Sequence, residues 1–582
     1  MTKRWLVTLA VLVIGAAAYA QPFVWPDAWT EHAGEEQYGG VYRSGQISGQ
    51  RTFNPFVSAE QNIVSTISDA GGAALITRNY ADWAEFIPYA AESFEVSEDG
   101  LVVDVVLRDG IFWSDGTPVT VEDYLFRYQA EIDEEVGSNA FTFWFVEGQL
   151  IELEATGENS LRFTFPAPDR TAFTQVALLP APNHILGEVY REGGAEALIA
   201  EWGTEVDVSQ TVWTGPFVPV QYVPDERIVF ERNEFFGEWN VDERGNALPY
   251  LDGLNYAIAD LDALLNLYIA GQIDQPSAPN LDQLGVINVA IQSGDIDATV
   301  IEAYSPQSGT TFYVFNWNRA SDPFKQELFR SEDFRKAMSH LTDRDAIVDL
   351  VYGGAATPVV APVPLVYPFW VNEDAPIFPY DPERALELLA GLGFTERNSE
   401  GVLVDEQGRA LEFNLATNAG NPEREQTIQI IADTAAEYGV RVNAQALDFT
   451  LLVDQLSATG DDRPFDAILI GFGGGFAEWP FLDNILPCDA NFHMWNLSGD
   501  CLTVEEGLVE EYMFAGRQTL DDDEAREIAF RLQEVYNELQ PMIYTVSVNL
   551  NASWLNAIGG NIPMDIMSSL TGTRDIVLTF RR

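Results

Sequence analysis

The sequence contains few cysteines, histidines and lysines, and these shortages narrow the possible functions. Its 582 residues include two cysteines, four histidines and three lysines. The histidines, His32, His184, His340 and His493, are scattered and show no H-E-x-x-H spacing, the pattern that holds a catalytic zinc. We therefore expect each histidine to be a surface or core residue rather than a metal ligand or a general base.

Motifs for phosphate binding and nucleophilic catalysis are also missing. The chain has no glycine-rich loop ending in Gly-Lys and no G-x-S-x-G turn. Asp and Glu total 90, so a close pair of carboxylates says little about acid-base catalysis. No pattern supports an enzyme, and we expect no cofactor and no resident metal; a secreted hydrolase remains the alternative from another class.

Positive charge is scarce as well. Only 31 residues are Lys or Arg, and the formal net charge is −59. Because nucleic-acid binding depends on neutralising phosphates with Lys and Arg, nucleic acid is excluded as a partner. The acidic residues are spread along the chain. This distribution is more typical of a solvated surface, which keeps the protein soluble, than of a site for cationic ligands.

The only long apolar run lies at the amino terminus. Lys3 and Arg4 precede an uncharged run from Trp5 to Ala18, and small residues flank a cleavage point after Ala20. The run is shorter than the ~20 residues that a bilayer span needs, so it predicts a secretory signal peptide over residues 1–20. We expect a periplasmic or secreted protein that is soluble after cleavage, with residues 21–38 as an exposed leader.

The two cysteines lie close together near the carboxyl terminus. Cys488 and Cys501 form a pair that, in an oxidising compartment, is more often a disulfide than two free thiols. A metal site is disfavoured because no further ligands cluster nearby. We therefore predict a disulfide between Cys488 and Cys501.

The most informative stretch is 91–126, where turn signals and a helix start follow at short intervals. Asp99-Gly100 predicts a hairpin turn before an apolar strand over 101–108. After two more turns, Thr120 is placed to cap a helix, with Asp123 three residues further on as a short capping box.

The carboxyl-terminal half alternates strands and helices. Asp381 and Pro382 predict the start of a helix that ends near Phe394. A strand at 411–415, a helix opened by Asn421-Pro422 and a strand at 440–446 form a predicted βαβ unit. A further apolar strand is predicted over 465–471 and an amphipathic helix over 524–539.

The segment 91–126 closely resembles the signature of the periplasmic dipeptide- and oligopeptide-binding proteins, family 5 of the extracellular solute-binding proteins that serve ABC importers. Further landmarks of that family follow in the same order: Thr214-Gly215-Pro216-Phe217, Gly271-Gln272-Ile273-Asp274, Asp322-Pro323-Phe324, Phe334-Arg335-Lys336-Ala337, Tyr380-Asp381-Pro382-Glu383 and Gln540-Pro541.

The resemblance implies an α/β fold of two lobes, the type II (cluster C) periplasmic-binding-protein fold, with a mostly β domain inserted in lobe I. Lobe I would comprise 36–70, 206–308 and 545–582, the insert 71–205, and lobe II 309–544. It also implies a monomer that captures a peptide or similar-sized solute by hinge closure. The solute would then pass intact to an ABC permease, with ATP used by separate ATPase subunits.

The best candidate for the binding site is the segment Gly471–Pro480. It follows an apolar strand directly, and ligands of α/β sheets bind at strand ends. Gly473, Gly474 and Gly475 would let backbone groups approach a ligand, while Phe472 and Trp479 offer aromatic faces. The alternative is a surface turn whose aromatic side chains cover the core.

The segment departs from the family at one important position. Peptide-binding relatives resemble G-W-x-G-D followed by D-P here, and the aspartate of that motif holds the amino terminus of the peptide. Gly475 stands at that position in this chain, and Trp479-Pro480 replaces the D-P pair. Glu478 is a candidate for supplying the missing charge.

This departure leaves the class of solute open between peptide and oligosaccharide. Trp479, Trp495 and Asn496 would suit stacked sugar rings, although such Trp residues more often pack in a core. We also expect the loop Ser44–Phe53 to face the cleft and Phe315–Asn318 to lie beside the hinge.

Overall fold

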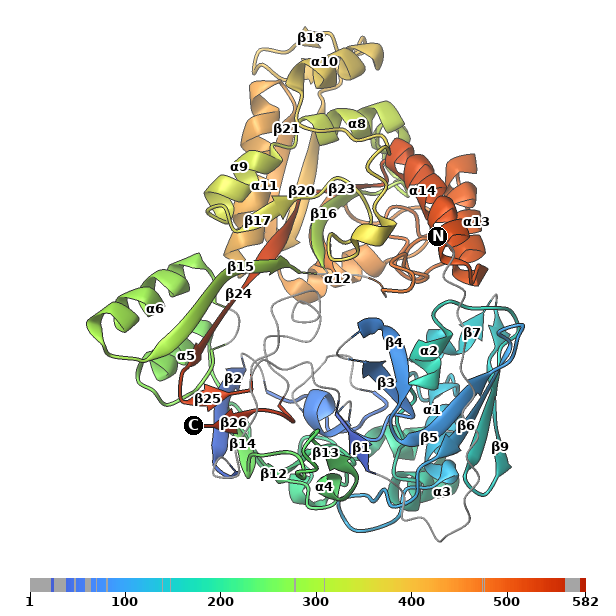
Figure 1. Cartoon of the computed structure of the whole chain (residues 1–582). Coiled ribbons are helices and arrows are strands. Elements are labelled where there is room, and N and C mark those ends of the chain that lie inside the picture. Colours follow the sequence, from blue (N-terminus) through green and yellow to red (C-terminus); the bar gives the residue numbers. More distant parts are fainter. Residues whose placement is uncertain are drawn as a thin grey trace.

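The computed structural model describes residues 22–25, 38–46, 49–57, 64–69, 71–79, 82–138, 140–146, 148–276, 279–307, 309–473, 475, 477–560 and 576–582. Two lobes lie one above the other in Figure 1. The predicted signal peptide, 1–20, falls outside the described residues. Within the described part of the chain, every helix is too short or too polar to cross a membrane.

Lobe II is built on a five-stranded sheet. Its order is β21 (Arg441–Leu447), β20 (Glu412–Asn418), β22 (Ala467–Phe472), β16 (Thr310–Phe315) and β23 (Met542–Tyr544). β20 runs parallel to β21 and β22, whereas β16 runs antiparallel to β22 and β23. Helix α11 (Pro422–Glu437) joins β20 to β21, so the βαβ unit predicted from the sequence is confirmed.

Local capping signals set the helix starts in this lobe. The Asn421 side chain accepts a hydrogen bond from the Arg424 backbone N–H, and Asp381 does the same for Arg384 at the start of α10. The other helices of the lobe are α7 (Pro323–Arg330), α8 (Glu332–His340), α9 (Arg344–Val351), α10 (Pro382–Gly391), α12 (Phe449–Ser457), α13 (Val504–Gln518) and α14 (Asp522–Leu539).

Lobe I contains a four-stranded sheet that joins distant parts of the chain. Its order is β11 (Phe217–Val223), β12 (Arg227–Arg232), β14 (Gly253–Ile258) and β2 (Val41–Gln46), with α5 (Leu261–Ile269) and α6 (Leu281–Ser293) following. The fully buried Asp274 carboxylate pairs with Arg43 at 2.5 Å and with Arg581 at 2.7 Å. This carboxylate therefore connects β2 with Arg581, next to the carboxyl terminus.

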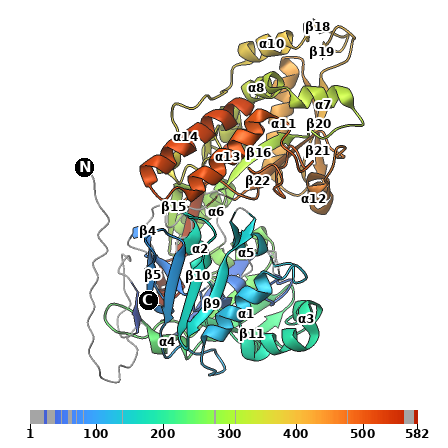
Figure 2. The same cartoon turned by 90° about the vertical axis from the view of Figure 1, so that its right-hand side faces the viewer.

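The segment 71–205, predicted as the insert and called so below, contains an antiparallel sheet of β5 (Ala91–Val96), β6 (Val102–Leu107), β10 (Ser160–Thr164) and β9 (Glu152–Gly157). Helix α1 (Val121–Glu131) begins after Thr120 as predicted, and the Asp123 carboxylate accepts from the Thr120 backbone N–H at 2.8 Å. Also within 71–205 are β3 (Ile76–Asn79), β4 (Asp82–Pro88), α2 (Ala172–Val176) and α3 (Glu188–Ala200). Figure 2 shows the insert directly below α13 and α14.

Two extended segments connect the lobes. β15 (Ala298–Pro306) leads into β16, and β23 leads into β24 (Val546–Leu555). β15 and β24 pair antiparallel, and β17 (Ala356–Pro358) pairs with the lobe II end of β24. The two crossings are therefore one hydrogen-bonded ribbon.

This topology corrects the expectation that Phe315–Asn318 lies beside the hinge. β16 begins at the crossing with Thr310, so its last residue, Phe315, is at the opposite end of the strand. The fully buried Asn316 amide donates to the backbone carbonyls of Arg463 and Phe465 inside lobe II.

The expectation of an exposed leader over 21–38 is also wrong in part. Phe23 and Trp25 are buried, and β1 (Phe23–Val24) pairs parallel with β13 (Asn240–Val241). The indole N–H of Trp25 donates to the Asn240 side chain at 3.0 Å, and the Phe23 ring packs edge-on against Tyr89 at 4.7 Å. Large aromatic side chains gain much from burial, and this outweighed the Pro and Glu around them.

Cys488 and Cys501 form a disulfide in lobe II. We expect the double Ser variant to lower the melting temperature of this lobe by roughly 5–10 °C, since closing such a loop contributes about 3 kcal/mol. Calorimetry of the oxidised, reduced and variant proteins measures this. Equal melting temperatures in all three would contradict the prediction.

Candidate functional site

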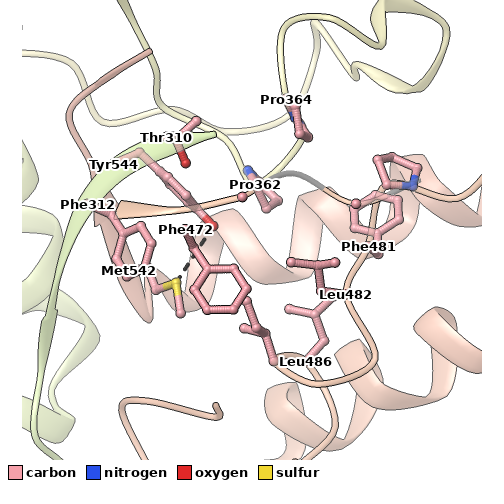
Figure 3. Close-up of a pocket in the computed structure, with 14 residues that line it drawn as sticks. Thr310, Phe312, Pro362, Pro364, Phe472, Phe481, Leu482, Leu486, Met542 and Tyr544 are labelled. Carbon is pink, nitrogen blue, oxygen red and sulfur yellow. Dashed lines mark hydrogen bonds between the residues drawn. The ribbon is translucent and has the colours of Figure 1, made fainter. Parts of the chain in front are cut away.

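A pocket opens where the central strands of lobe II end. Thr310, the first residue of β16, pairs directly with Phe472, the last residue of β22. Ligands of α/β sheets bind beyond the carboxyl ends of the strands, so a site is expected at this edge. We call this the apolar pocket; Figure 3 shows its lining, which consists of Thr310, Phe312, Pro362, Pro364, Phe472, Gly473, Gly475, Pro480, Phe481, Leu482, Ile485, Leu486, Met542 and Tyr544.

None of the described residues that line the apolar pocket carries a charged side chain. The space not filled by protein atoms at the pocket is about 450 Å³, counted together with the open solvent at its mouth. Its polar side-chain groups are the hydroxyls of Thr310 and Tyr544. Burial raises the pKa of Tyr544, whose hydroxyl lies 3.1 Å from that of Tyr536, so it remains neutral. Such a pocket suits an apolar group of a ligand.

The backbone of the loop after β22 is held from one side by lobe II. The Tyr367 hydroxyl donates to the Gly475 carbonyl at 2.9 Å, and the Trp370 indole N–H donates to the Ala477 carbonyl at 2.8 Å. Burial, together with the charge of Glu478, raises the pKa of Tyr367 to about 12, so this hydroxyl stays a donor. These two hydrogen bonds fix the backbone at Gly475 and Ala477 beside the pocket.

The same path explains why glycine occupies position 475. A Cβ atom there would lie 2.5 Å from the backbone oxygen of Pro480. An aspartate at this position would require the loop to move. The departure from the peptide-binding pattern is thus part of the local packing.

Glu478 is already paired with a cation. Its carboxylate lies 2.5 Å from the guanidinium of Arg78, on β3 of the insert, and only 16% and 14% of the two side chains are exposed. A ligand amine would have to compete with this arginine for the carboxylate. Glu478 therefore connects lobe II to the insert in this structure.

A second pocket lies between the insert and lobe II. We call it the insert pocket; it encloses about 630 Å³, including open solvent, and is lined by Phe143, Thr171 and Gln175 of the insert and by Gly475, Trp479, Phe481, Leu482, Asp483, Asn484 and Arg517 of lobe II. Trp479 is 1% exposed and packs against Trp370 with ring centroids 5.4 Å apart. It is both a wall of this pocket and a core residue.

Ion pairs surround the insert pocket. Arg517 on α13 binds the buried carboxylate of Asp169 through two nitrogens, at 2.6 and 3.0 Å, and pairs with Asp483 at 2.8 Å. Burial alone would lower the pKa of Arg517, but the hydrogen bonds and charges of these two carboxylates outweigh it and raise the pKa. The guanidinium therefore stays charged.

The neighbouring Arg170 extends this contact. It donates to the backbone carbonyls of Glu478 and Thr519, pairs with Asp522 at 2.5 Å, and lies over the Trp370 ring. We call the contacts of Arg78, Asp169 and Arg170 with lobe II the insert–lobe II ion pairs. They hold the two bodies together on the side away from the crossings.

Trp495 and Asn496 lie in the interior of lobe II, so they are not part of the site that we propose. They are 1% and 0% exposed. Their indole and amide nitrogens donate to the buried Glu506 carboxylate at 2.9 and 3.2 Å, and His493 shares the same oxygen at 3.0 Å. This cluster stabilises the loop closed by the disulfide.

Most of the other residues predicted for the binding site from the sequence lie at one or both of the two pockets. Phe472, Gly473 and Gly475 line the apolar pocket, and Gly475 and Trp479 line the insert pocket. Gly474 falls outside the described residues. In the loop Ser44–Phe53, Phe53 is buried in the core of lobe I, and 47–48 fall outside the described residues.

Several lining residues were missed from the sequence. Phe312, Met542 and Tyr544 come from two strands far from 471–480, and only the sheet order brings them together. Gln175, which lines the insert pocket, and Arg78, which pairs with Glu478, belong to the insert. A turn rich in glycine indicated one wall of the site, but no local signal indicated the others.

The buried Glu506 predicts a pH dependence of stability. Its burial would raise the pKa, but the donors around it outweigh this and lower the pKa below 4.5. The ionised Glu506 carboxylate therefore contributes its full stability to the fold above the pKa that it has in the unfolded state. This contribution is lost as the pH falls through the pKa that it has in the folded state. We expect Glu506→Gln to lower the melting temperature at pH 7, and this difference to shrink below about pH 4. A difference that stays constant with pH would contradict the assignment.

A variant at Asp169 tests whether the insert–lobe II ion pairs contribute to solute binding. Asp169→Asn removes the charge that Arg517 faces while keeping the side-chain shape. We expect solute affinity, measured by calorimetry, to fall about tenfold, since a hydrogen bond to a charged group contributes roughly 1.5–3 kcal/mol. The control is Asp523→Asn, whose side chain is 88% exposed. Equal affinities of both variants and the parent would contradict a role in closure.

Comparisons with known proteins agree with this architecture. Residues 85–492 match the bacterial extracellular solute-binding proteins, family 5 Middle. A "Probable ABC transporter-binding protein" of Deinococcus radiodurans is 35% identical over 595 residues, covering 99% of each chain.

Two solved structures show the same fold. The oligopeptide-binding protein AppA of Bacillus subtilis, in complex with a nonapeptide, has a TM-score of 0.73 at 20% identity, covering 94% of this chain and 99% of its own. The periplasmic binding protein MelB of Agrobacterium fabrum, in complex with stachyose, has a TM-score of 0.69 at 22% identity, covering 90% and 82%. The two-lobed α/β fold predicted from the sequence is confirmed. The chain belongs to the bacterial extracellular solute-binding proteins, family 5.

Proposed function

We propose that this protein captures an oligopeptide between its lobes and delivers it intact to an ABC permease, whose ATPase subunits are separate proteins. It works outside the cytoplasmic membrane after cleavage of the leader near Ala20. The observation that carries the peptide assignment is the uncharged, apolar pocket beside the backbone of Gly473 and Gly475. A peptide offers both an apolar side chain and main-chain hydrogen-bonding groups to such a surface.

The alternative solute is an oligosaccharide. The relative from Agrobacterium fabrum binds stachyose, and the aromatic residues Phe143 and Trp479 of the insert pocket suit sugar rings. However, a sugar presents many hydroxyls, and the described residues of the apolar pocket include two hydroxyl side chains, Thr310 and Tyr544, to bind them. The apolar pocket therefore favours a peptide side chain such as leucine, whose full burial contributes roughly 1.5–3 kcal/mol.

The charge distribution indicates how the peptide is recognised. Position 475 carries no carboxylate, and the Glu478 carboxylate is paired with Arg78. We infer that the peptide is held through its side chains and main chain rather than through the charge of its amino terminus. A free and an acetylated amino terminus are then recognised similarly.

Hinge closure supplies the coupling to transport. The ribbon of β15 and β24 lets lobe II approach lobe I and the insert. A peptide that contacts both sides shifts the population toward the closed form by the difference in its affinity for the two forms. The permease would recognise the closed form.

A peptide screen tests this proposal. We expect leucine-containing tetrapeptides to raise the melting temperature by mass action, and amino-terminal acetylation to change calorimetric affinity less than about threefold. Stabilisation by cello- or manno-oligosaccharides alone would overturn the peptide assignment. A loss of binding on acetylation would overturn the mode of recognition.

Phe472→Ala tests the position of the site. Removing this wall of the apolar pocket should weaken binding of a leucine peptide about tenfold, because less apolar surface is buried. The matched control is Phe449→Ala, since Phe449 on α12 is 55% exposed and lines neither pocket. Unchanged affinity in Phe472→Ala would remove the apolar pocket from the site.

A further inference from the structure

We infer that a groove beside the disulfide of lobe II is a second recognition site, which binds an arginine side chain of the same peptide. We call it the disulfide groove; its lining residues are Ser457, Thr459, Gly460, Cys488, Asp489, Ala490, Asn491, Phe492, Leu497, Ser498 and Gly499. This inference rests on the proposed function, because it adds a specificity to the peptide whose apolar side chain fills the apolar pocket.

The walls of the disulfide groove are fixed to each other. One wall is the end of α12 with the turn after it, and the other is the loop closed by the bond between Cys488 and Cys501. The backbone N–H of Gly460, on the first wall, donates to the carbonyl of Leu497, on the second, at 3.1 Å. The space not filled by protein atoms is about 1100 Å³, counted together with the open solvent at its mouth. Both walls belong to lobe II, so the groove has its shape before a ligand binds.

The charge of the disulfide groove indicates a cationic ligand. The structure describes all of the lining residues, and Asp489 is the one charged side chain among them. Asp489 is exposed, and within the described part of the chain no cation or hydrogen-bond donor engages its carboxylate. A ligand cation therefore meets no competing arginine here, in contrast to Glu478, which is paired with Arg78.

The composition of the groove favours an organic cation over a metal ion. Hard cations such as Ca²⁺ take about six to eight oxygen ligands, usually from several carboxylates, and this groove has one carboxylate. It also has an aromatic ring that a ligand can reach, because Phe492 is 37% exposed. A carboxylate and an aromatic face in one groove are the two groups that bind an organic cation.

An arginine side chain matches this combination. Its planar guanidinium can stack on the Phe492 ring, and its fork of N–H groups can bind the Asp489 carboxylate through two nitrogens. The remaining N–H groups can donate to hydroxyl oxygens such as those of Ser457 and Thr459. A lysine ammonium is a compact, strongly hydrated point charge, which offers neither a flat face nor a fork.

A pair of aromatic rings separates the disulfide groove from the apolar pocket. Phe492 lines the groove, Phe472 lines the apolar pocket, and their ring centroids lie 5.5 Å apart. An extended peptide advances roughly 3.3 Å per residue, so a side chain roughly two to four residues from the leucine reaches past this pair. One peptide can therefore place leucine in the apolar pocket and arginine in the disulfide groove.

Calorimetry with matched pentapeptides tests this site. Each peptide has leucine at one end or the other, and each remaining position in turn carries arginine or citrulline, which has nearly the same shape without the charge. We expect one position at which arginine binds about fivefold more tightly than citrulline, the effect of an exposed ion pair together with a cation–π contact. Because the contact is exposed, this preference should shrink in about 1 M salt, where charges are screened within roughly 3 Å.

Two variants of Asp489 and a matched control locate the effect. Asp489→Asn should abolish the preference for arginine over citrulline, while the preference for leucine over alanine, which arises in the apolar pocket, should persist. Asp489→Lys should reverse the charge preference, so that glutamate binds more tightly than arginine at the same position. The control is Asp454→Asn, since Asp454 is exposed on α12 and does not line the groove; it should behave as the parent protein.

The outcomes separate this inference from the proposed function. Leucine peptides that bind equally well with arginine and with citrulline at every position would overturn the disulfide groove as a site and leave the proposed function standing. An arginine preference that persists in Asp489→Asn would do the same. Failure of every leucine peptide to bind would overturn the proposed function, and this inference with it.

Discussion

The pairing of the two crossings, β15 and β24, constrains how lobe II can be placed relative to lobe I and the insert. Because β15 and β24 are hydrogen-bonded to each other, the lobes are joined along one side by a single ribbon. In Figure 1 this ribbon lies on the left, while α13 and the insert meet on the right. Closure about the ribbon, as we propose it, would make or break the contacts of Arg78, Asp169 and Arg170 with lobe II together. The proposed solute, bound between the lobes, would act on the same equilibrium.

The excess of acidic residues in the chain makes the contacts of Arg78, Arg170 and Arg517 between the insert and lobe II more important. With a net charge of −59, negative charges predominate in the chain, and like charges repel one another at low ionic strength. The few cations matter more for this reason, and Arg78, Arg170 and Arg517 all lie where the insert meets lobe II. Arginine suits this place, since its planar fork binds a carboxylate through two nitrogens, as Arg517 binds Asp169.

Features set by neighbouring residues were predictable from the sequence. The starts of α1 and α10 follow from Thr120 and Asp381, and the βαβ unit follows from its alternating patterns. Features set by long-range contacts were not. Phe23 is buried by a partner about two hundred residues away, and Trp495 is directed inward by Glu506.

The candidate site was likewise predictable only where neighbouring residues define it. The glycine-rich loop after β22 was identifiable because glycine and strand ends are local signals. The pairing of Glu478 with Arg78 joins residues four hundred positions apart, and it changes the role expected for that carboxylate. No motif near the loop indicated this contact with the insert.

Solution scattering with and without a leucine-containing tetrapeptide at saturation tests the central claim most directly. Closure about the ribbon predicts a smaller radius of gyration for the bound protein, and a smaller change for Asp169→Asn at equal occupancy. An identical radius with and without peptide, at an occupancy verified by calorimetry, would contradict capture by closure.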